Sequence, residues 1–517
     1  MTNLFDRLPL PPRADVAAGQ RPAGAAIVGA SLEFRSGGSL SRGYGRGLTL
    51  IEMLVALAVT LVMMAAVVNL FANMSASIRN RRAAIETGSQ LRQVRNRLAM
   101  DLSGATCRGS TWQDPAENQG YIEIIEGEWS DKNPSNLTDG QTGNNELDYT
   151  TSLVPSSQAF DPDSGIAADG RNLGSGAVTD GRGLGDWDDV LALTVRSESD
   201  PFTARVRNPV TNKDELVESP LAEVFWFAQQ PYNSANPGPN DGFRRIDRKV
   251  LLIAPWLGPW TFPPDNVSAH LDQSTGQWVA NTLGDLTKRE NRSYHDNALT
   301  SFPHRLDLAR LNNAANSDSR VLDSSLAFDV RVFDPGAPLY ALGNDILEPN
   351  DYGWAGALAT AGAANASGYG AYCDLGWGFD YTTGSMAYQT SAAVSPAPLP
   401  LFNEIRPAGY HQRSSPQTNA VTLYPAAYDT WSYHYENDGI NQDSLWQTNA
   451  VAWQMNTIDQ GANGLDDDNA NGVDDRGERE TSPPYDVPLR GVKVILRVYE
   501  PDSRQIRESS VTHSFKQ

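Results

Sequence analysis

The chain has 517 residues, of which 40% are hydrophobic, and its formal net charge at neutral pH is −21. This length suits two or three domains and a sizeable core. Glycine and proline number 44 and 32, a composition that favours long loops over compact helices. The acidic balance excludes the basic chains typical of nucleic-acid binding, so we expect no nucleic-acid partner.

The charge is spread unevenly along the chain. Residues 1–47 and residues 48–103 each carry six arginines against three acidic residues, so everything from residue 104 onward is strongly acidic. Such a remainder suits a solvated domain outside the cytoplasm, of a kind able to gather divalent cations.

Residues 1–47 have the features of a leader. They contain four prolines and end in a glycine- and arginine-rich run at 41–47, and their apolar patch at 25–28 is too short for the core of a secretory signal. Because positive charge beside a membrane span stays in the cytoplasm, we expect the residues that follow the span to face outward.

A transmembrane helix is predicted over residues 48–72. From Leu48 to Val68 only Thr49, Glu52 and Thr60 are not apolar, and about 25 helical residues span roughly 38 Å, enough to cross a bilayer. Placing a carboxylate inside such an apolar run costs about 2.5–3.5 kcal/mol unless a positive group neutralises its charge. If the chain were cut after Gly47, the new amino group of Leu48 would lie at the i, i+4 spacing from Glu52 and could neutralise it, within one chain or on a neighbouring one.

These residues resemble the type IV prepilin signal shared by pilins and the pseudopilins of type II secretion. The resemblance implies cleavage between Gly47 and Leu48 by prepilin peptidase, methylation of the Leu48 amine, and packing of the helix with other pilins or pseudopilins in a fibre, with Glu52 as the assembly residue. The family usually has Phe where this chain has Leu48. The alternative is a simple signal anchor with an accidental Glu52. The motif reads Arg46-Gly47-Leu48-Thr49-Leu50-Ile51-Glu52.

The helix is expected to continue to residue 103, giving a pilin helix over 48–103. Its apolar residues fall on two faces, Met74, Ile78 and Ile85 on one and Leu91, Val94, Leu98 and Leu102 on another, with Gly88 between them. Either the helix bends or restarts at Gly88, or its lower part contacts other subunits while its upper part packs on the chain's own head. We interpret the six arginines between 79 and 97 as a solvated basic face.

From residue 104 the periodicity changes to short strands between turn-rich segments. The predicted fold is therefore α+β: a long N-terminal helix, transmembrane in its first half, followed by an antiparallel β-rich head with long loops and a large insertion at about 336–485. We expect this insertion to pack on the head as an added subdomain and not to form a free linker. The predicted strands are 121–125, 190–196, 224–228, 250–254, 326–335 and 493–501.

The segments 326–335 and 493–501 both end in Arg-Val-aromatic-acid-Pro, which predicts a strand closed by a turn. The last segment, 492–515, predicts a terminal hairpin that turns at 500–503. This ending resembles the minor pseudopilins and minor pilins of the J or W type.

A calcium loop is the sharpest motif in the head. Residues 467–478 fit the D-x-[DN]-x-[DN]-G-x5-E pattern, in which hard oxygen ligands alternate around a glycine turn. The flanks do not predict the helices of an EF-hand, and the alternative is an Asp/Asn/Gly turn without an ion. The candidate calcium ligands are Asp467, Asn469, Asn471, the carbonyl of Val473, Asp475 and Glu478.

Cys107 and Cys373 are the two cysteines. Outside the cytoplasm they could form one disulfide, and two buried thiols are the alternative. The chain lacks a P-loop, a Gly-x-Ser-x-Gly elbow and a His-Glu-x-x-His motif, and its six histidines are dispersed. We therefore expect surface or packed histidines and no enzymatic activity.

The predicted function is that of a minor pilin or pseudopilin. It would be anchored in the bacterial inner membrane by a single span with its head in the periplasm, and would then enter a type II secretion pseudopilus or a type IV pilus. The alternative is a pilus-associated adhesin or ligand-binding subunit with a calcium-stabilised head. A third alternative, a membrane-tethered hydrolase, would need polar residues clustered in a deep pocket, which the sequence gives no reason to expect.

Overall fold

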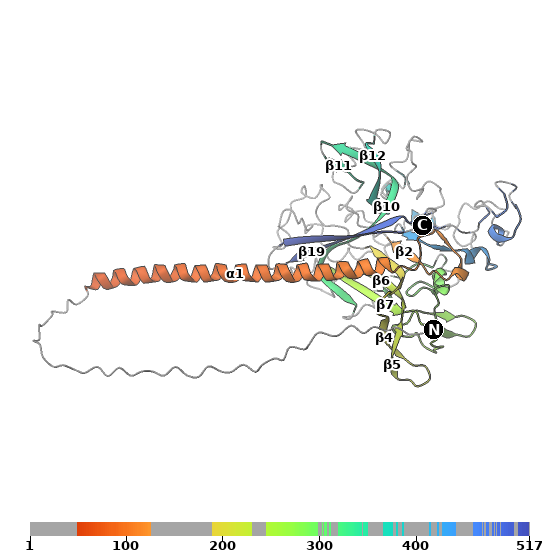
Figure 1. The fold of residues 1–517 in the computed structure, drawn as a ribbon, viewed down its shortest axis with the longest axis horizontal. Coiled ribbons are helices and arrows are strands. Elements are labelled where there is room, and N and C mark those ends of the chain that lie inside the picture. Colours follow the sequence, from red (N-terminus) through yellow and green to blue (C-terminus); the bar gives the residue numbers. More distant parts are fainter. Residues whose placement is uncertain are drawn as a thin grey trace, which may run out of the picture. The chain divides into compact units, whose positions relative to one another are not determined.

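The computed structural model describes residues 49–125, 189–229, 244–297, 319–343, 345–349, 366–375, 427–440, 459–467, 488–500 and 505–515, with short pieces within 302–311, 379–422 and 469–485. One long helix, α1 (Leu50–Ser103), is followed by an antiparallel β-rich head (Figure 1). The α+β prediction is confirmed. The chain divides into two compact units at Phe71 and Ala72, so the first part of α1 and the rest of the chain are described separately.

A ten-stranded sheet forms the centre of the head within the described residues. Its strands run in the order β17-β2-β3-β6-β7-β10-β19-β20, and β11 and β12 also pair with β10. The strands are β2 (Ile122–Ile125), β3 (Val190–Arg196), β6 (Leu221–Gln229), β7 (Arg244–Leu252), β10 (Arg320–Leu342), β11 (Asp345–Leu347), β12 (Gly368–Cys373), β17 (Ala427–Asp429), β19 (Gly491–Glu500) and β20 (Gln505–Ser514).

Smaller elements surround this sheet. They are the strands β1 (Trp112–Gln113) and β18 (Trp431–Ser432), the hairpins β4 (Phe202–Arg207) with β5 (Asp214–Ser219) and β8 (Ala269–Asp272) with β9 (Gln277–Ala280), the pairs β13 (Phe379–Asp380) with β14 (Ser385–Met386) and β15 (Arg413–Ser414) with β16 (Val421–Thr422), and the 3-10 turns η1 (Pro115–Glu117), η4 (Asp285–Thr287), η5 (Arg289–Asn291), η7 (Tyr433–Glu436) and η9 (Gln460–Ala462).

The sheet has a buried core on each face, because successive side chains of a strand point to opposite sides. In β3, Leu191 and Leu193 belong to the core that includes α1, whereas Val190 and Ala192 belong to the opposite core. Leu286, Trp431 and the surrounding segments cover that second face. β3 is buried on both faces, which explains why it reads as a nearly continuous apolar run.

The upper half of α1 packs against the first face. Leu91, Val94, Leu98 and Leu102 are all buried in the same core cluster as the sheet, and their spacing places them on one side of the helix. Met74, Ile78 and Ile85 are 51%, 52% and 70% exposed. The upper part of the helix therefore packs on the chain's own head, as expected, and contact of the lower part with other subunits stays a prediction.

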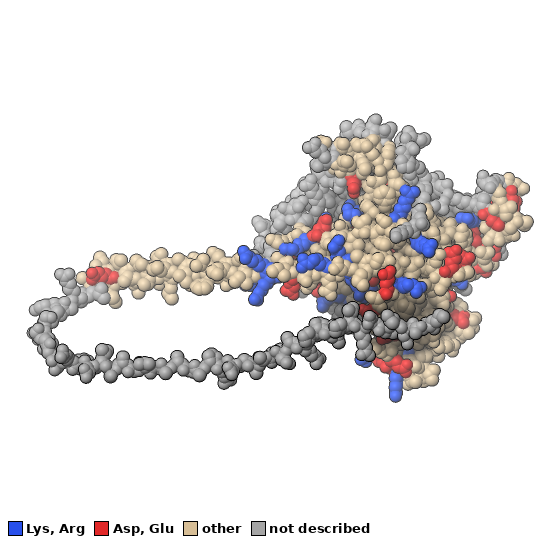
Figure 2. Space-filling model, in the orientation of Figure 1, with Lys and Arg blue, Asp and Glu red and all other residues tan. Residues whose placement is uncertain are grey.

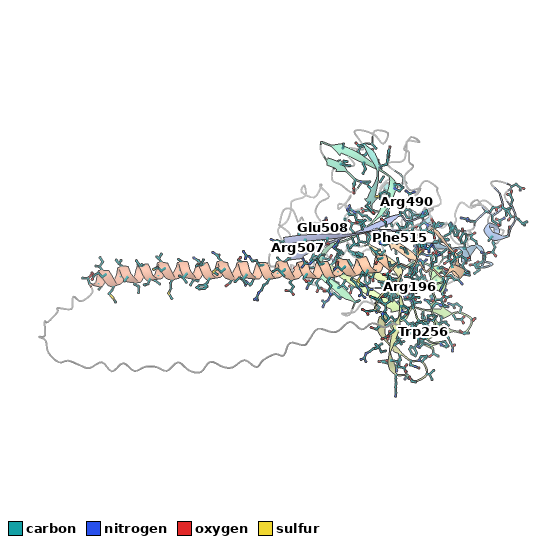
Figure 3. The ribbon with its side chains drawn as sticks, in the orientation of Figure 1. Arg196, Trp256, Arg490, Arg507, Glu508 and Phe515 are labelled. Atoms are coloured by element: carbon teal, nitrogen blue, oxygen red, sulfur yellow. The ribbon has the colours of Figure 1, made fainter. Side chains whose placement is uncertain are left out.

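Of the two alternatives for Gly88, a restart of the helix does not occur, because α1 is continuous from Leu50 to Ser103. A Cβ at Gly88 would lie 3.2 Å from a guanidinium nitrogen of Arg507. The glycine therefore makes room for the Arg507 side chain of β20, and it does not interrupt the helix. Figure 3 shows Arg507 and Glu508 beside α1. Thr87 also donates a short hydrogen bond to Glu500, and Arg95 donates one to the Ser510 carbonyl at 3.1 Å.

One buried carboxylate fixes the end of the helix to the sheet. Asp101 accepts two hydrogen bonds from the Arg248 guanidinium, at 2.6 and 2.7 Å, and one from the Trp226 indole at 2.8 Å. All three residues are buried. A bidentate arginine–carboxylate pair is strong and geometrically specific, so it sets the orientation of the last helical turn against β6 and β7.

The prediction that Pro335 closes a strand is wrong. β10 continues through Pro335 to Leu342, with a register shift between Asp334 and Pro338 in its pairing with β12. A bulge is one of the few places in a sheet that accept proline, and Asp334 supports it by accepting a 2.7 Å hydrogen bond from the Gly336 amide. The similar segment 493–500 belongs to β19, which is the neighbour of β10: Phe328 faces Leu496 and Val330 faces Val494.

The predicted terminal hairpin is present as β19 and β20, paired from Gly491–Ser514 to Glu500–Gln505; the turn at 501–504 lies outside the described residues. The 336–485 region was predicted to be an insertion packed on the head, but part of it belongs to the central sheet. β17 within it pairs with β2 and forms one edge of the central sheet, and Tyr428, Trp431 and Tyr435 are buried in its cores. This part of the predicted insertion therefore completes the fold.

Candidate functional site

The apolar first part of α1 is an unburied surface. Every large hydrophobic side chain from Leu50 to Phe71 is between 49% and 83% exposed, and α1 contains a segment long and apolar enough to cross a membrane. In Figure 2 this part of the helix is tan apart from an acidic group at its start. So much apolar surface requires lipid or partner helices to cover it.

Glu52 and Thr49 form a reciprocal cap at the start of α1. The Glu52 carboxylate accepts hydrogen bonds from the Thr49 amide at 2.8 Å and the Thr49 hydroxyl at 3.0 Å, while the Glu52 amide donates to the Thr49 hydroxyl at 3.3 Å. This is the capping-box arrangement, which satisfies amides that a helix start leaves without partners. Sequence reasoning missed it, although Thr-x-x-Glu before an apolar run is its signal.

The cap gives Glu52 a local role at the helix start in addition to its predicted role in assembly. A carboxylate has several lone pairs, and Thr49 occupies only part of this capacity. The negative charge itself remains uncompensated by any cation among the described residues near it. Glu52 can therefore hold the helix start and still attract a positive group. Gly47 and Leu48, the predicted cleavage and methylation residues, lie outside the described residues.

The predicted calcium loop is described only in part, since Asn471 and Asp475 lie outside the described residues. Glu478 is buried and accepts a short hydrogen bond from the Asp467 amide, and Asp467 accepts one from Asn463 at 2.6 Å. Asn469 and Gly472 adopt left-handed backbone conformations. No group of three acidic, histidine or cysteine side chains placed to hold a metal occurs in the described part of the chain, so calcium binding here stays a prediction.

The two cysteines are not joined by a disulfide. Cys107 lies in the core between α1 and the sheet, and Cys373 lies in a separate cluster around Ala337 and Tyr340. The Cys373 thiol faces the Val332 carbonyl at 3.9 Å. Burial raises the pKa of Cys107 to about 11, so this thiol is unreactive and packs as a small apolar residue. The alternative of two buried thiols is therefore the one that the structure has.

A fully buried cluster of charges lies under the second face of the sheet, and sequence reasoning did not find it. Glu123 of β2 and Asp429 of β17 are direct partners across the strand pair. Arg289 and Arg292 bridge the two carboxylates: Arg292 lies 3.2 Å from Glu123 and 2.8 Å from Asp429, Arg289 lies 3.1 Å from Glu123, and Arg289 also contacts Asp429. The His295 ring is 2.7 Å from Glu123.

This cluster has the features of a structural clamp. Its five side chains are 0% exposed, so their charges are satisfied by one another rather than by water. Arg292 also donates to the Leu286 and Thr430 carbonyls, each at 3.1 Å, and lies 4.0 Å from the centre of the Tyr121 ring. The pairing ties the 285–297 segment to the edge of the sheet, where an unpaired charge would be costly.

The pKa values follow from these contacts. Burial alone would raise the pKa of Glu123, but the Arg289 charge and the His295 contact outweigh burial and hold this pKa well below its usual value. Burial lowers the pKa of His295, against the opposing pull of Glu123. The prediction of packed histidines therefore fits His295 and also His304, whose pKa is lowered by burial as well.

An exposed apolar helix with a capped carboxylate at its start, joined to a β-rich head, is consistent with a protein anchored in a membrane by its N-terminal helix. Residues 44–68 match the family model of the prokaryotic N-terminal methylation motif, which is typical of type IV prepilin-like proteins. The predicted prepilin resemblance is confirmed at this level. No curated protein and no solved structure matches the chain.

Proposed function

We propose that this protein is a minor pilin or pseudopilin that enters, or primes, a type II secretion pseudopilus or a type IV pilus. The observation that carries this proposal is the exposed apolar surface of residues 50–71, which overlaps the methylation motif at residues 44–68 and is interrupted by Glu52. The same helix suits lipid before assembly and neighbouring helices afterwards, since both environments accept apolar side chains. The J or W subtype is part of the proposal.

In this mechanism, prepilin peptidase cuts between Gly47 and Leu48 and methylates the new amine of Leu48. The helix anchors the chain in the inner membrane with its head in the periplasm. As the helix leaves lipid for the fibre core, Glu52 pairs with the Leu48 amine of a neighbour and fixes the axial register. Capping by Thr49 keeps the carboxylate at the helix start until that partner arrives.

Mass spectrometry of the mature N-terminus tests the processing step. We expect the chain isolated from its native membrane to begin at a methylated Leu48. A chain that retains residues 1–47, or begins elsewhere, would contradict the proposal.

Substitutions at the helix start separate the two roles of Glu52. Glu52→Gln preserves a capping side chain, because glutamine also completes a capping box, but it removes the charge. Thr49→Ala preserves the charge and weakens the cap, at a cost of about 0.5–2 kcal/mol in helix stability. We expect Glu52→Ala and Glu52→Gln to lower incorporation into sheared fibres at least tenfold, with processing intact, and Thr49→Ala to assemble. Normal incorporation of Glu52→Gln would show that charge pairing does not set the register.

A ligand-binding subunit is the second candidate, favoured by a pocket of about 580 Å³ on the side of the sheet opposite α1. His270, Trp278 and Asn291 line it, and its volume is in the range of small-ligand sites. Binding of the full chain to a glycan array, with and without EDTA, tests this function and its calcium dependence. The absence of any glycan bound in both conditions would exclude carbohydrate as the ligand.

A further inference from the structure

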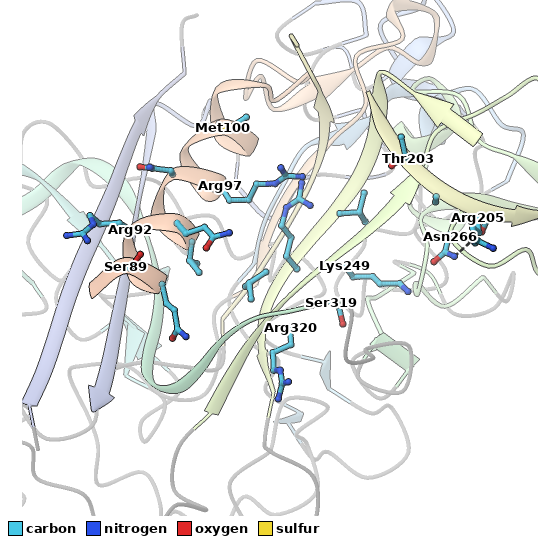
Figure 4. Close-up of a pocket in the computed structure, with 18 residues that line it drawn as sticks. Ser89, Arg92, Arg97, Met100, Thr203, Arg205, Lys249, Asn266, Ser319 and Arg320 are labelled. Carbon is cyan, nitrogen blue, oxygen red and sulfur yellow. Dashed lines mark hydrogen bonds between the residues drawn. The ribbon is translucent and has the colours of Figure 1, made fainter. Parts of the chain in front are cut away.

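A basic groove lies beside the upper part of α1, within the unit that contains the head. It has a volume of about 1190 Å³ and is lined by α1 from Ser89 to Met100, by β4, β7 and the first residues of β10. In Figure 4, Arg97 extends from α1 towards the strands, and Arg92 and Arg205 lie at opposite edges of the view. The groove is open to solvent and is distinct from the apolar surface of residues 50–71.

The charge of this groove is opposite to that of the chain. Its lining contains no aspartate or glutamate, whereas the whole chain carries −21. Blue side chains also gather on α1 and the adjoining head surface in Figure 2. Six cationic residues line the groove: Arg92, Arg97, Arg205, Arg248, Lys249 and Arg320.

Several of these cations lack a carboxylate. Arg248 is satisfied by Asp101. Arg320 forms an exposed pair with Asp323 at 3.4 Å, a kind of pair that contributes little. Arg92, Arg97 and Arg205 are exposed and form no ion pair with any residue in the described ranges. Partial burial of the guanidinium, and after it the charge of Arg248, lowers the pKa of Arg97 against the opposing pull of Asp101. An anion in the groove would relieve this crowding.

The dimensions indicate what kind of anion fits. The groove exceeds the 300–1,000 Å³ usual for small ligands, and Gln90, Gln93, Asn96 and Asn266 on its walls can hydrogen-bond a peptide backbone. Membrane phosphates at the end of the predicted span are out of range, because Ala72 and Ser89 lie 17 helical steps, or about 26 Å, apart along α1, well beyond a Debye length. A nucleic acid, with its dense charge, would be repelled by the acidic remainder of the head.

We propose that this groove binds a carboxylate-rich segment of a partner polypeptide, namely a neighbouring subunit of the fibre. The identity of the partner rests on the proposed assembly function, whereas recognition of carboxylates rests on the groove itself. This revises the interpretation of the arginines of α1 as a uniformly solvated face: Arg92 and Arg97 line the binding groove, while Arg79, Arg81 and Arg82 lie on helix surface outside it.

The test uses the full-length chain in neutral detergent and a fluorescein-labelled 12-residue peptide rich in glutamate, with a glutamine version as its control. The triple variant Arg92→Gln, Arg97→Gln, Arg205→Gln should weaken binding at least tenfold. The variant Arg79→Gln, Arg81→Gln, Arg82→Gln removes the same charge elsewhere on the helix and should weaken binding less than twofold. Thermal unfolding of both variants checks that the head remains folded.

Equal loss in the two variants would show attraction by net charge alone and overturn the proposal. Tighter binding of a 12-base-pair DNA or of vesicles containing phosphatidylglycerol would also overturn it, in favour of those ligands. Peptide binding does not require fibres, so it can succeed when assembly fails. Conversely, groove variants that lose the peptide yet enter fibres normally would refute the docking role and leave the assembly proposal intact.

Discussion

At the scale of single residues, the head depends on charges that water cannot reach. Glu123 and Asp429 face each other across two strands, and the arrangement is tolerable only because Arg289 and Arg292 neutralise both. The residues are distant in sequence, and neither their spacing nor their type distinguishes them from the many acidic residues of this chain. Sequence patterns could therefore not have revealed the cluster, since only the folded sheet brings its members together.

Glu123→Gln should destabilise the head by about 3–5 kcal/mol, because it leaves buried arginine charge without its counter-ion. Urea unfolding followed by tryptophan fluorescence measures this loss. Glu508→Gln is the matched control: its pair with Arg497 is at the surface and should cost less than about 1 kcal/mol. Similar costs for the two variants would contradict the clamp role of the cluster.

Calcium at the 467–478 loop is also a matter of a few residues. If the loop binds calcium, a hundredfold excess over the dissociation constant raises the free energy of unfolding by about 2.7 kcal/mol, and EDTA reverses the increase. Asp475→Asn should abolish the effect. Asp474→Asn should not, because Asp474 is outside the predicted ligand set and accepts a hydrogen bond from the Gly464 amide instead. A melting temperature unchanged by calcium would support the ion-free turn.

At the scale of elements, α1 shows how far periodicity can be trusted. The spacing of apolar residues identified the buried face at Leu91, Val94, Leu98 and Leu102, because packing against a sheet needs one continuous stripe. The same reasoning did not anticipate the role of Gly88, which makes room for the Arg507 side chain of β20. It also failed at Pro335, where a bulge accommodates the ring. Both errors came from partners far away in the sequence.

The two faces of α1 should respond differently to truncation. Leu98→Ala removes a fully buried side chain and should cost about 2–5 kcal/mol of head stability. Ile85→Ala, on the exposed face, should change it by no more than about 0.5 kcal/mol. Chemical denaturation of the full-length variants in detergent compares them directly. A large loss at Ile85 would mean that the head covers this face in solution.

At the scale of the whole molecule, most strands of the central sheet could be predicted, because their apolar runs are short and bounded by turns. The contribution of residues 427–436 could not, since a two- or three-residue strand carries no period. The composition from residue 104 onward predicted a strongly acidic head but not where its basic residues would lie. The fold instead concentrates basic side chains beside α1, and that arrangement depends on the pairing of β7 with β10.

Stability should fall as the pH is lowered from 7.5 to 5. Burial lowers the pKa of His295, His304, His434 and His513 in the folded chain, so the unfolded chain takes up more protons below its histidine pKa of about 6.5. Glu123, with its lowered pKa, should add a further loss below about pH 4.5. Melting temperatures across this range measure the effect, and His304→Gln should reduce it. A stability that rises on acidification would contradict the sign.

The ion pair between Asp101 and Arg248 would also bear mechanical load if the helix is part of the proposed fibre. Together with the buried stripe of α1 and its bonds to β19 and β20, this ion pair joins the last turn of the helix to the sheet. Arg248→Met would leave the anchor and the processing motif untouched, yet pulling should detach such heads at lower tension than native ones. In the proposed assembly, this ion pair would contribute to the mechanical coupling of helix and head.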